Sequence, residues 1–228
     1  MMRILLVAGL VWGTLAVASE PVAYVNGEPI TRGELDRATG LAEILFSLSQ
    51  QFPAFAQSLL LTEEGKAFLA RYERDVLEKL ILQRVQLQEA RARSLTVDEE
   101  EVERRTEETL NQIYLYYALT EEEFAAGLLL QGDTLERFRN DIARQHRENL
   151  LLSALKAAVL AEITVSEEEI ASSYNEDPER FVDEEGEPLP LSHVRERIAA
   201  ILRAEKGEAH WQAWLAAARE RAVVEINL

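Results

Sequence analysis

The chain has 228 residues, of which 47% are hydrophobic, 7% aromatic and 29% charged, so it can build a packed core and is not a disordered polymer. Its 24 lysines and arginines are outnumbered by 41 aspartates and glutamates, and the formal net charge of −17 disfavours nucleic acid as a partner. The chain has no cysteine, which excludes disulfides, thiolate metal sites and a cysteine nucleophile.

The first 19 residues have the pattern of an export signal. Arg3 precedes an apolar run from Ile4 to Trp12, and Ala16-Val17-Ala18 fits the small-residue pattern of a cleavage site. The run is shorter than the roughly 20 residues that a membrane-spanning helix needs. We therefore expect a signal peptide over 1–19, and a mature chain over 20–228 that lies outside the cytoplasm with no stable membrane insertion.

Short β-strands are predicted at the start of the mature chain. The strand-like run Val22–Val25 is followed by Asn26-Gly27, which is a strong signal for a hairpin turn. A return strand over Glu28–Ile30 contains Pro29, which restricts it to the edge of a sheet.

The next unusual segment has no charged side chain from Ile44 to Thr62, in a chain that is 29% charged. Pro53 divides this segment into two predicted helices. An internal helix pair and an exposed apolar surface for another chain are both compatible with the pattern, and exposed apolar patches usually mark interaction sites. The candidate polypeptide-binding residues in this segment are Leu45, Phe46, Leu48, Phe52, Phe55 and Leu59.

Four polar residues, each followed three positions later by a glutamate, predict helix starts. They are Thr31, Asp98, Thr120 and Ser166. In such a capping box the polar side chain accepts from a first-turn amide while the glutamate reaches back to the cap amide. Apolar residues between these starts recur with helical spacing, which predicts a mainly α protein with a helical lobe over about residues 98–162.

A group of aromatic residues forms a second candidate binding surface. Tyrosines combine an apolar ring with a polar hydroxyl, which suits adaptable recognition, although core packing is equally compatible. The candidates in this group are Tyr114, Tyr116, Tyr117 and Phe124.

The C-terminal part begins with a linker over 175–191 that is rich in proline and glycine, followed by a helix and a strand over 192–228. The last residues place Val224, Ile226 and Leu228 on one face of a strand. A strand needs a partner, and a lone hairpin is only marginally stable. We therefore expect this strand to pair with the N-terminal hairpin, so that a small sheet closes nearly the whole mature chain into one unit.

The sequence indicates no catalytic site. The runs Glu99–Glu101 and Glu121–Glu123 fall in the first turns of predicted helices, where solvated carboxylates stabilise the helix rather than act as acid and base. The three histidines, at positions 146, 193 and 210, are too scattered for a metal motif. We expect no catalytic residue, no bound metal and no cofactor.

Several segments together resemble the SurA-type and PrsA-type extracytoplasmic chaperones. They occur in the same order as in that family: 22–31, 95–102, 123–139, 163–170, 174–181 and 194–228. The family usually inserts a parvulin prolyl-isomerase domain after the segment that matches Phe181. Here only the segment Val182–Leu191 separates Phe181 from the C-terminal helix, and this segment is too short to contain a parvulin domain.

The resemblance implies a multi-helix chaperone core that holds unfolded chains in an apolar groove. It implies a soluble periplasmic holdase that uses no ATP and has no enzymatic activity, with unfolded or extended exported and outer-membrane proteins as its partners. Two alternatives stay open. One is a peptidyl-prolyl isomerase of the parvulin-containing family, and the other is a structural protein that uses Ile44–Thr62 for homodimerisation and binds no client.

Overall fold

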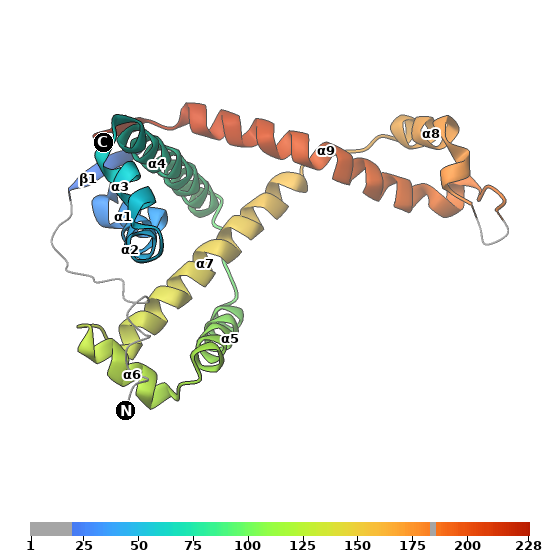
Figure 1. Ribbon diagram of the computed structural model, residues 1–228. Coiled ribbons are helices and arrows are strands. Elements are labelled where there is room, and N and C mark those ends of the chain that lie inside the picture. The colour runs from blue at the N-terminus through green and yellow to red at the C-terminus, as the bar shows by residue number, and fades with distance from the viewer. Residues whose placement is uncertain (1–19, 183–185) are drawn as a thin grey trace. The chain divides into compact units, whose positions relative to one another are not determined.

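The computed structural model describes residues 20–182 and 186–228 (Figure 1). The expected signal peptide, 1–19, lies outside the described residues. The described chain is mainly helical with one small sheet, as the sequence predicts. Its elements are β1 (Pro21–Val25), β2 (Glu28–Thr31), α1 (Arg32–Thr39), α2 (Leu41–Gln51), α3 (Pro53–Leu61), α4 (Glu63–Ala92), α5 (Glu99–Tyr117), α6 (Glu121–Leu130), α7 (Leu135–Leu160), α8 (Glu167–Glu176), a 3₁₀ turn (Pro178–Arg180), α9 (Leu191–Arg221) and β3 (Val224–Ile226).

The chain divides into two compact units. One contains the residues up to Leu152 together with Arg221–Leu228, and the other contains Ser153–Glu220. We expected the mature chain to close as nearly one unit. The sheet does join the two chain ends within the first unit, but residues 153–220 pack among themselves as the second.

The sheet confirms the predicted pairing of the chain ends. Its strand order is β2-β1-β3, both pairs are antiparallel, and Val25 lies opposite Val224. Asn26 and Gly27 form the hairpin turn with φ values of 50° and 83°. The Asn26 side chain also accepts a hydrogen bond from the amide of Val223 at 2.8 Å, so the turn residue itself holds the C-terminal strand.

All four predicted capping residues start helices. Thr31, Thr120 and Ser166 form complete capping boxes at α1, α6 and α8. Asp98 caps α5 by accepting from the amide of Glu100, without the reciprocal bond from Glu101. The reason is that the Glu101 carboxylate accepts hydrogen bonds from Arg104 and Arg105 instead.

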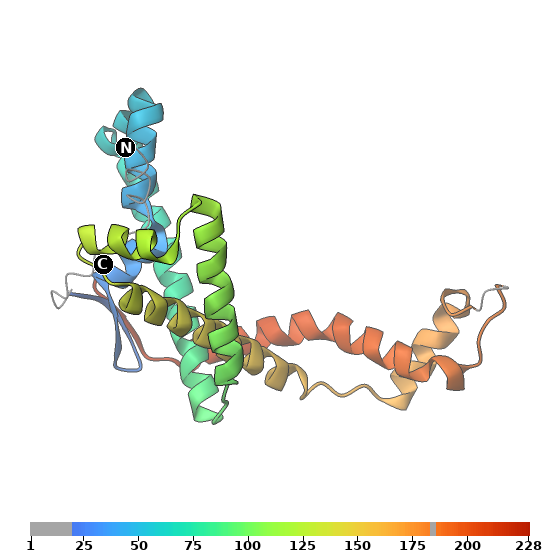
Figure 2. The same cartoon turned by 90° about the horizontal axis from the view of Figure 1, so that it is seen from below.

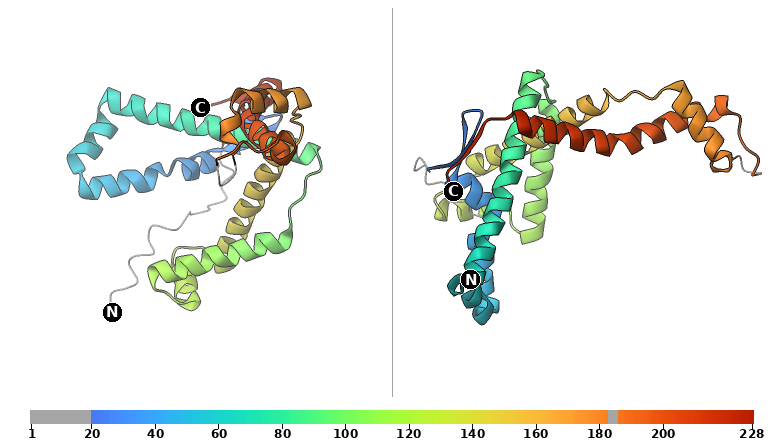
Figure 3. Two further views of the ribbon diagram at one scale, coloured as in Figure 1. Left: turned by 90° about the vertical axis from the view of Figure 1, so that its right-hand side faces the viewer. Right: turned by 90° about the horizontal axis from the view of Figure 1, so that it is seen from above.

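Helices α2 and α3 fold back along the start of α4 in the first unit (Figure 2). We call residues 41–72, which comprise α2, α3 and the start of α4, the helical arm. The left view of Figure 3 shows its outgoing and returning helices most clearly. The arm continues from a base in which α1 and the remainder of α4 pack against the sheet.

Helices α5 and α6 pack with the first part of α7. Phe124 and Leu128 of α6 form the centre of this cluster, and Tyr114 and Phe138 contact Phe124 edge-to-face with ring centroids 5.5 and 5.2 Å away. The exposed side chain of Arg147 on α7 donates hydrogen bonds to Glu99 on α5 and so links the two helices.

The second unit has its own core, built on α8 and α9. Ile170, Phe181, Val194, Ile198 and Ala199 are its buried residues. Further along α9, the rings of Trp211 and Trp214 stack with centroids 5.2 Å apart, and Trp211 is buried.

Candidate functional site

The helical arm exposes apolar side chains that an ordinary core would bury. Its first two helices contain one charged residue, Glu43. In the part of the chain that the structure describes, α2 has no buried residue and α3 has only Ala56. A helix that is apolar on most of its surface normally lies inside a protein. Because exposed apolar surface usually marks an interaction site, α2 and α3 are candidate binding elements.

Specific contacts hold the root of the arm. Gly40 adopts a left-handed conformation with φ +58°, which ends α1 and starts α2 in a new direction. The hydroxyl of Tyr72, on α4, donates to the carbonyl of Thr39 at 3.0 Å, and the Thr39 hydroxyl donates to the carbonyl of Asp36 at 2.9 Å. The first bond ties the end of α1, just before α2 begins, to α4, and the second holds the Thr39 side chain within α1.

A close backbone approach holds the turn between α3 and α4. Thr62 caps α4 by accepting from the amide of Gly65 at 3.1 Å. Gly65 is buried, and a Cβ at this position would lie 2.4 Å from the carbonyl oxygen of Leu59 and 2.5 Å from that of Ser58. Only glycine allows the two helices to approach so closely here.

The three helices of the arm enclose an apolar groove of about 500 Å³. Its residues come from all three helices, so the groove depends on the fold of the arm. They are Leu41, Ile44, Leu45, Leu48, Phe55, Leu59, Phe68, Leu69 and Tyr72. A groove of this kind can accept apolar side chains of another chain but has no charged group to impose a sequence.

The outer surface of the arm is also apolar. Phe46 is 68% exposed and Leu61 72% exposed, and Phe52 and Leu60 are exposed as well. Of the candidates in this segment, Phe46, Phe52 and Phe55 lie on the surface, whereas Leu45, Leu48 and Leu59 are half-buried along the groove. The structure therefore brings Leu45, Leu48, Phe55 and Leu59 together, while Phe46 and Phe52 lie outside the groove lining.

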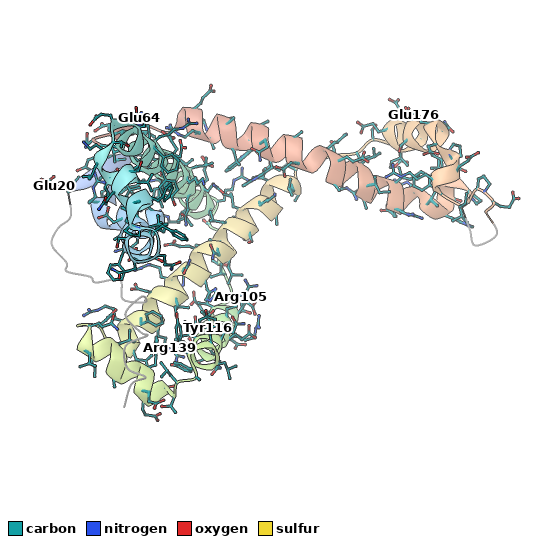
Figure 4. All side chains as sticks on the ribbon, in the orientation of Figure 1. Glu20, Glu64, Arg105, Tyr116, Arg139 and Glu176 are labelled. Atoms are coloured by element: carbon teal, nitrogen blue, oxygen red, sulfur yellow. The ribbon has the colours of Figure 1, made fainter. Side chains whose placement is uncertain are left out.

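The tyrosine group is split between core and surface. Tyr116, which is labelled in Figure 4, lies on α5. Its side chain is 82% exposed, and Tyr117 contacts its ring edge-to-face with centroids 4.9 Å apart. Tyr114 is half-buried against Phe124. Phe124 is fully buried, so its selection as a binding residue is wrong: its ring fills the centre of the α5–α6–α7 cluster.

Sequence reasoning missed several exposed leucines and one phenylalanine. They are Leu60, Leu61, Phe68, Leu115, Leu129 and Leu130. For Leu129 and Leu130 the sequence did contain a usable signal. Three consecutive leucines, Leu128 to Leu130, point in different directions around the short helix α6, so they cannot all face one core.

The titratable groups form structural ion pairs. The carboxylate of Glu101 accepts hydrogen bonds from Arg104 and Arg105, which lower its pKa from 4.5 to about 2. His146 lies 2.9 Å from the hydroxyl of Thr109 and so packs within the helix cluster. Among the described residues no group of three or more histidine, aspartate or glutamate side chains is arranged to hold a metal.

The helical arm combines an apolar groove with an exposed apolar surface, on a base whose sheet joins the two chain ends. The SurA-like N-terminal domain matches residues 1–152, well over half of the chain, and the chain belongs to this family. Family membership implies a chaperone-like role in protein folding, as the resemblance of the sequence predicted.

The curated relatives are named foldase protein PrsA. The one from Clostridium botulinum (strain Langeland) is 25% identical over 179 residues, which are 78% of this chain and 51% of the relative. The one from Clostridium kluyveri is 25% identical over 180 residues, 78% of this chain and 52% of the relative. The chain thus spans about half the length of the curated relatives it matches.

The family consists of extracytoplasmic chaperones. Within the stretches 20–182 and 186–228, no helix combines the length and the apolar character needed to cross a bilayer.

Proposed function

We propose that this protein is a holdase chaperone that acts without ATP in the periplasm and binds unfolded exported or outer-membrane polypeptides on its helical arm. The observation that supports this role most directly is the exposure of Phe46, Leu61 and Phe68 beside an apolar groove in a family of chaperones. A holdase needs no catalytic group. It needs accessible apolar surface that binds the unfolded state and so lowers the concentration of aggregating chains.

The chemistry of the arm supports weak, replaceable binding. Its segment Ile44–Thr62 is rich in leucine and phenylalanine, has serine and glutamine between them and contains no charged side chain, and contacts of this kind follow buried apolar area rather than sequence. The high net negative charge elsewhere keeps such a protein soluble despite the exposed patch.

The same proposal includes the absence of isomerase activity. Between Phe181 and α9 the chain has room only for a short loop, in which Val182 pairs with Pro188. A protease-coupled assay on a proline peptide should show no catalysis above the uncatalysed rate, and catalysis that rises with protein concentration would contradict this part of the proposal.

The holdase proposal is tested by light scattering from an unfolded outer-membrane protein diluted out of urea. The wild type in stoichiometric excess should suppress the scattering. The variant Phe46→Gln, Leu61→Gln, Phe68→Gln should lose most of this suppression, because it removes apolar surface from exposed positions and leaves the helices intact. Circular dichroism should show unchanged helix content.

The matched control is Val223→Gln with Leu228→Gln. These side chains are also exposed and apolar, but they lie beside the sheet rather than on the arm. This control should suppress aggregation like the wild type. Full suppression by the arm variant, or no suppression by the wild type, would contradict the proposal.

The exposed arm also supports a second candidate function, homodimerisation through residues 41–72. Light scattering for mass distinguishes the two. A wild-type dimer that becomes a monomer in the arm variant, while client protection is retained, would assign the arm to self-association instead of client binding.

A further inference from the structure

The last turns of α5 and α6 each present two large apolar side chains to solvent. Leu115 and Tyr116 are 81% and 82% exposed, and Leu129 and Leu130 are 65% and 77% exposed. Figure 4 marks Tyr116 on α5 in the first unit. These turns are separate from the helical arm in sequence and belong to different helices.

Both turns are already anchored from their other faces. Tyr114 packs on Phe124 on one side of α5, and Leu128 is fully buried on one side of α6. The exposed residues are therefore apolar side chains on helix ends that are anchored from their other sides. Such a surface exposes apolar area without a folding benefit, which is typical of an interaction site.

Unlike the arm, these turns lie on strongly acidic helices. Residues 99–130 contain nine glutamates and two arginines. The two arginines, Arg104 and Arg105, form ion pairs with Glu101 of the same helix. Arg139 of the neighbouring helix α7 pairs with Glu103 and Glu107.

The helix ends add to the negative potential. The last turns, Tyr114–Tyr117 of α5 and Gly127–Leu130 of α6, contain no lysine or arginine, so no side chain of theirs offsets the partial negative charge of a helix C-terminus. At Tyr114, burial is the main cause that raises the pKa of the hydroxyl; the nearby Glu121 and Glu107 raise it further, and Arg139 opposes them. A cation that approaches here gains from the acidic groups, from the helix ends and from the face of the Tyr116 ring.

We infer that the last turn of α5 and the last turn of α6 provide two further docking points, and that their occupant is a segment of unfolded polypeptide that combines apolar side chains with lysine or arginine. This inference rests on the proposed holdase function and adds a charge preference that the apolar groove of the arm, which no charged side chain lines, cannot supply. A second copy of this chain is a poorer occupant, because its net charge of −17 repels the same acidic surface.

The test uses fluorescently labelled extended peptides with one apolar sequence, flanked by lysines, by serines or by glutamates. Fluorescence anisotropy with the wild type should show the lysine peptide binding about fivefold to tenfold more tightly than the serine peptide, and the glutamate peptide most weakly. The preference should shrink in high salt, since exposed charges are screened. Equal affinity for the three peptides, or no binding, would overturn the inference.

Three variants test which residues produce the preference for the lysine peptide. Leu115→Gln with Tyr116→Gln, and likewise Leu129→Gln with Leu130→Gln, should weaken the lysine peptide. Glu121→Gln with Glu122→Gln should reduce the lysine preference while the serine peptide binds as before. Glu123 is left unchanged because it completes the capping box of α6, and circular dichroism verifies the fold. Unchanged lysine preference in all three variants would place it elsewhere and refute the inference.

The arm variant separates the two proposals. It should lose aggregation suppression and keep the lysine preference. If it loses neither, the holdase assignment of the arm fails while the charge preference stands. If the α5 and α6 variants only convert a wild-type dimer to a monomer, with peptide affinities unchanged, these turns are a self-association surface and the inference is wrong.

Discussion

Gly65 is the residue on which the shape of the arm depends most directly. A methyl group there would lie 2.4 Å from a backbone oxygen of α3, and backbone cannot move aside as a flexible side chain can. The close packing of α3 on α4 therefore predicts an unusual sensitivity to the smallest possible substitution.

Gly65→Ala should lower the free energy of unfolding by about 1–3 kcal/mol, the usual cost of overpacking. Urea unfolding followed by circular dichroism measures it. The control is Gly207→Ala on α9, where a Cβ meets Leu160 at an ordinary 3.5 Å. That substitution should be neutral or stabilise by up to about 1 kcal/mol through helix propensity. Equal effects of the two substitutions would refute the close-approach argument.

The two arginines of α5 lower the pKa of the Glu101 carboxyl group. Hydrogen bonds from Arg104 and then Arg105 lower its pKa to about 2, so the folded state holds the ionised form. Because the folded pKa lies below the unfolded value near 4.5, the stabilisation is fully present above pH 4.5. It is lost as the pH falls from 4.5 through about 2.

Side-chain NMR should give a titration midpoint for Glu101 near 2 in the wild type. Arg104→Gln with Arg105→Gln should move the midpoint upward toward 4.5, and added salt should move it in the same direction because the group is exposed. Glu101→Gln should flatten the fall of the melting temperature between these pH values. A wild-type midpoint near 4.5 would refute the ion-pair account.

At the residue scale, the capping residues were predictable and the exposure of aromatic residues was not. A cap such as Thr120 is decided within four residues of the chain. Whether an aromatic ring meets water depends on distant neighbours: Phe124 is buried because Tyr114 and Phe138 cover it, whereas Tyr116 is exposed. The composition of a segment carries no such information.

At the element scale, helix α6 depends on its capping box because its sequence leaves it little else. It has ten residues and buries only Phe124 and Leu128. Thr120 accepts from the amide of Glu123, and the Glu123 carboxylate accepts from the amide of Thr120 at 2.9 Å. An isolated helix of this length is unstable in water.

Thr120→Ala should therefore destabilise the protein by about 0.5–2 kcal/mol, the usual loss for an N-cap. Thr120→Ser should retain most of the stability, since serine keeps the accepting oxygen. The measurement is chemical denaturation of both variants. A loss in the serine variant as large as in the alanine variant would show that the threonine methyl group, and not the cap, is responsible.

Element boundaries and pairings were largely predictable from the sequence. Pro53 ends α2 and begins α3 because proline fits the first turn of a helix but not its interior. The last seven residues correctly predicted a strand that pairs with the N-terminal hairpin, and its partner in the hairpin is β1. The groove was not predictable, because it arises from the angle at Gly40 and the close approach at Gly65.

At the scale of the whole molecule, the buried core of the first unit and the proposed binding surface belong to different parts of the chain. The sheet, α1 and α4 form a base in which Ala23, Val25, Leu77 and Ile81 are fully buried. The arm adds exposed apolar surface to that base. The base therefore keeps its own buried core while the arm exposes apolar side chains. The second unit, residues 153–220, has its own core.

Site-specific photo-crosslinking to an unfolded outer-membrane protein tests the central claim most directly. A photoreactive phenylalanine replaces Phe46 or Phe52 on the arm, and Ala200, an exposed residue of α9, serves as the reference position. Both arm positions should crosslink to the unfolded client but not to the same client after folding, and Ala200 should give little crosslinking. Equal yields at the three positions, or none on the arm, would contradict the account.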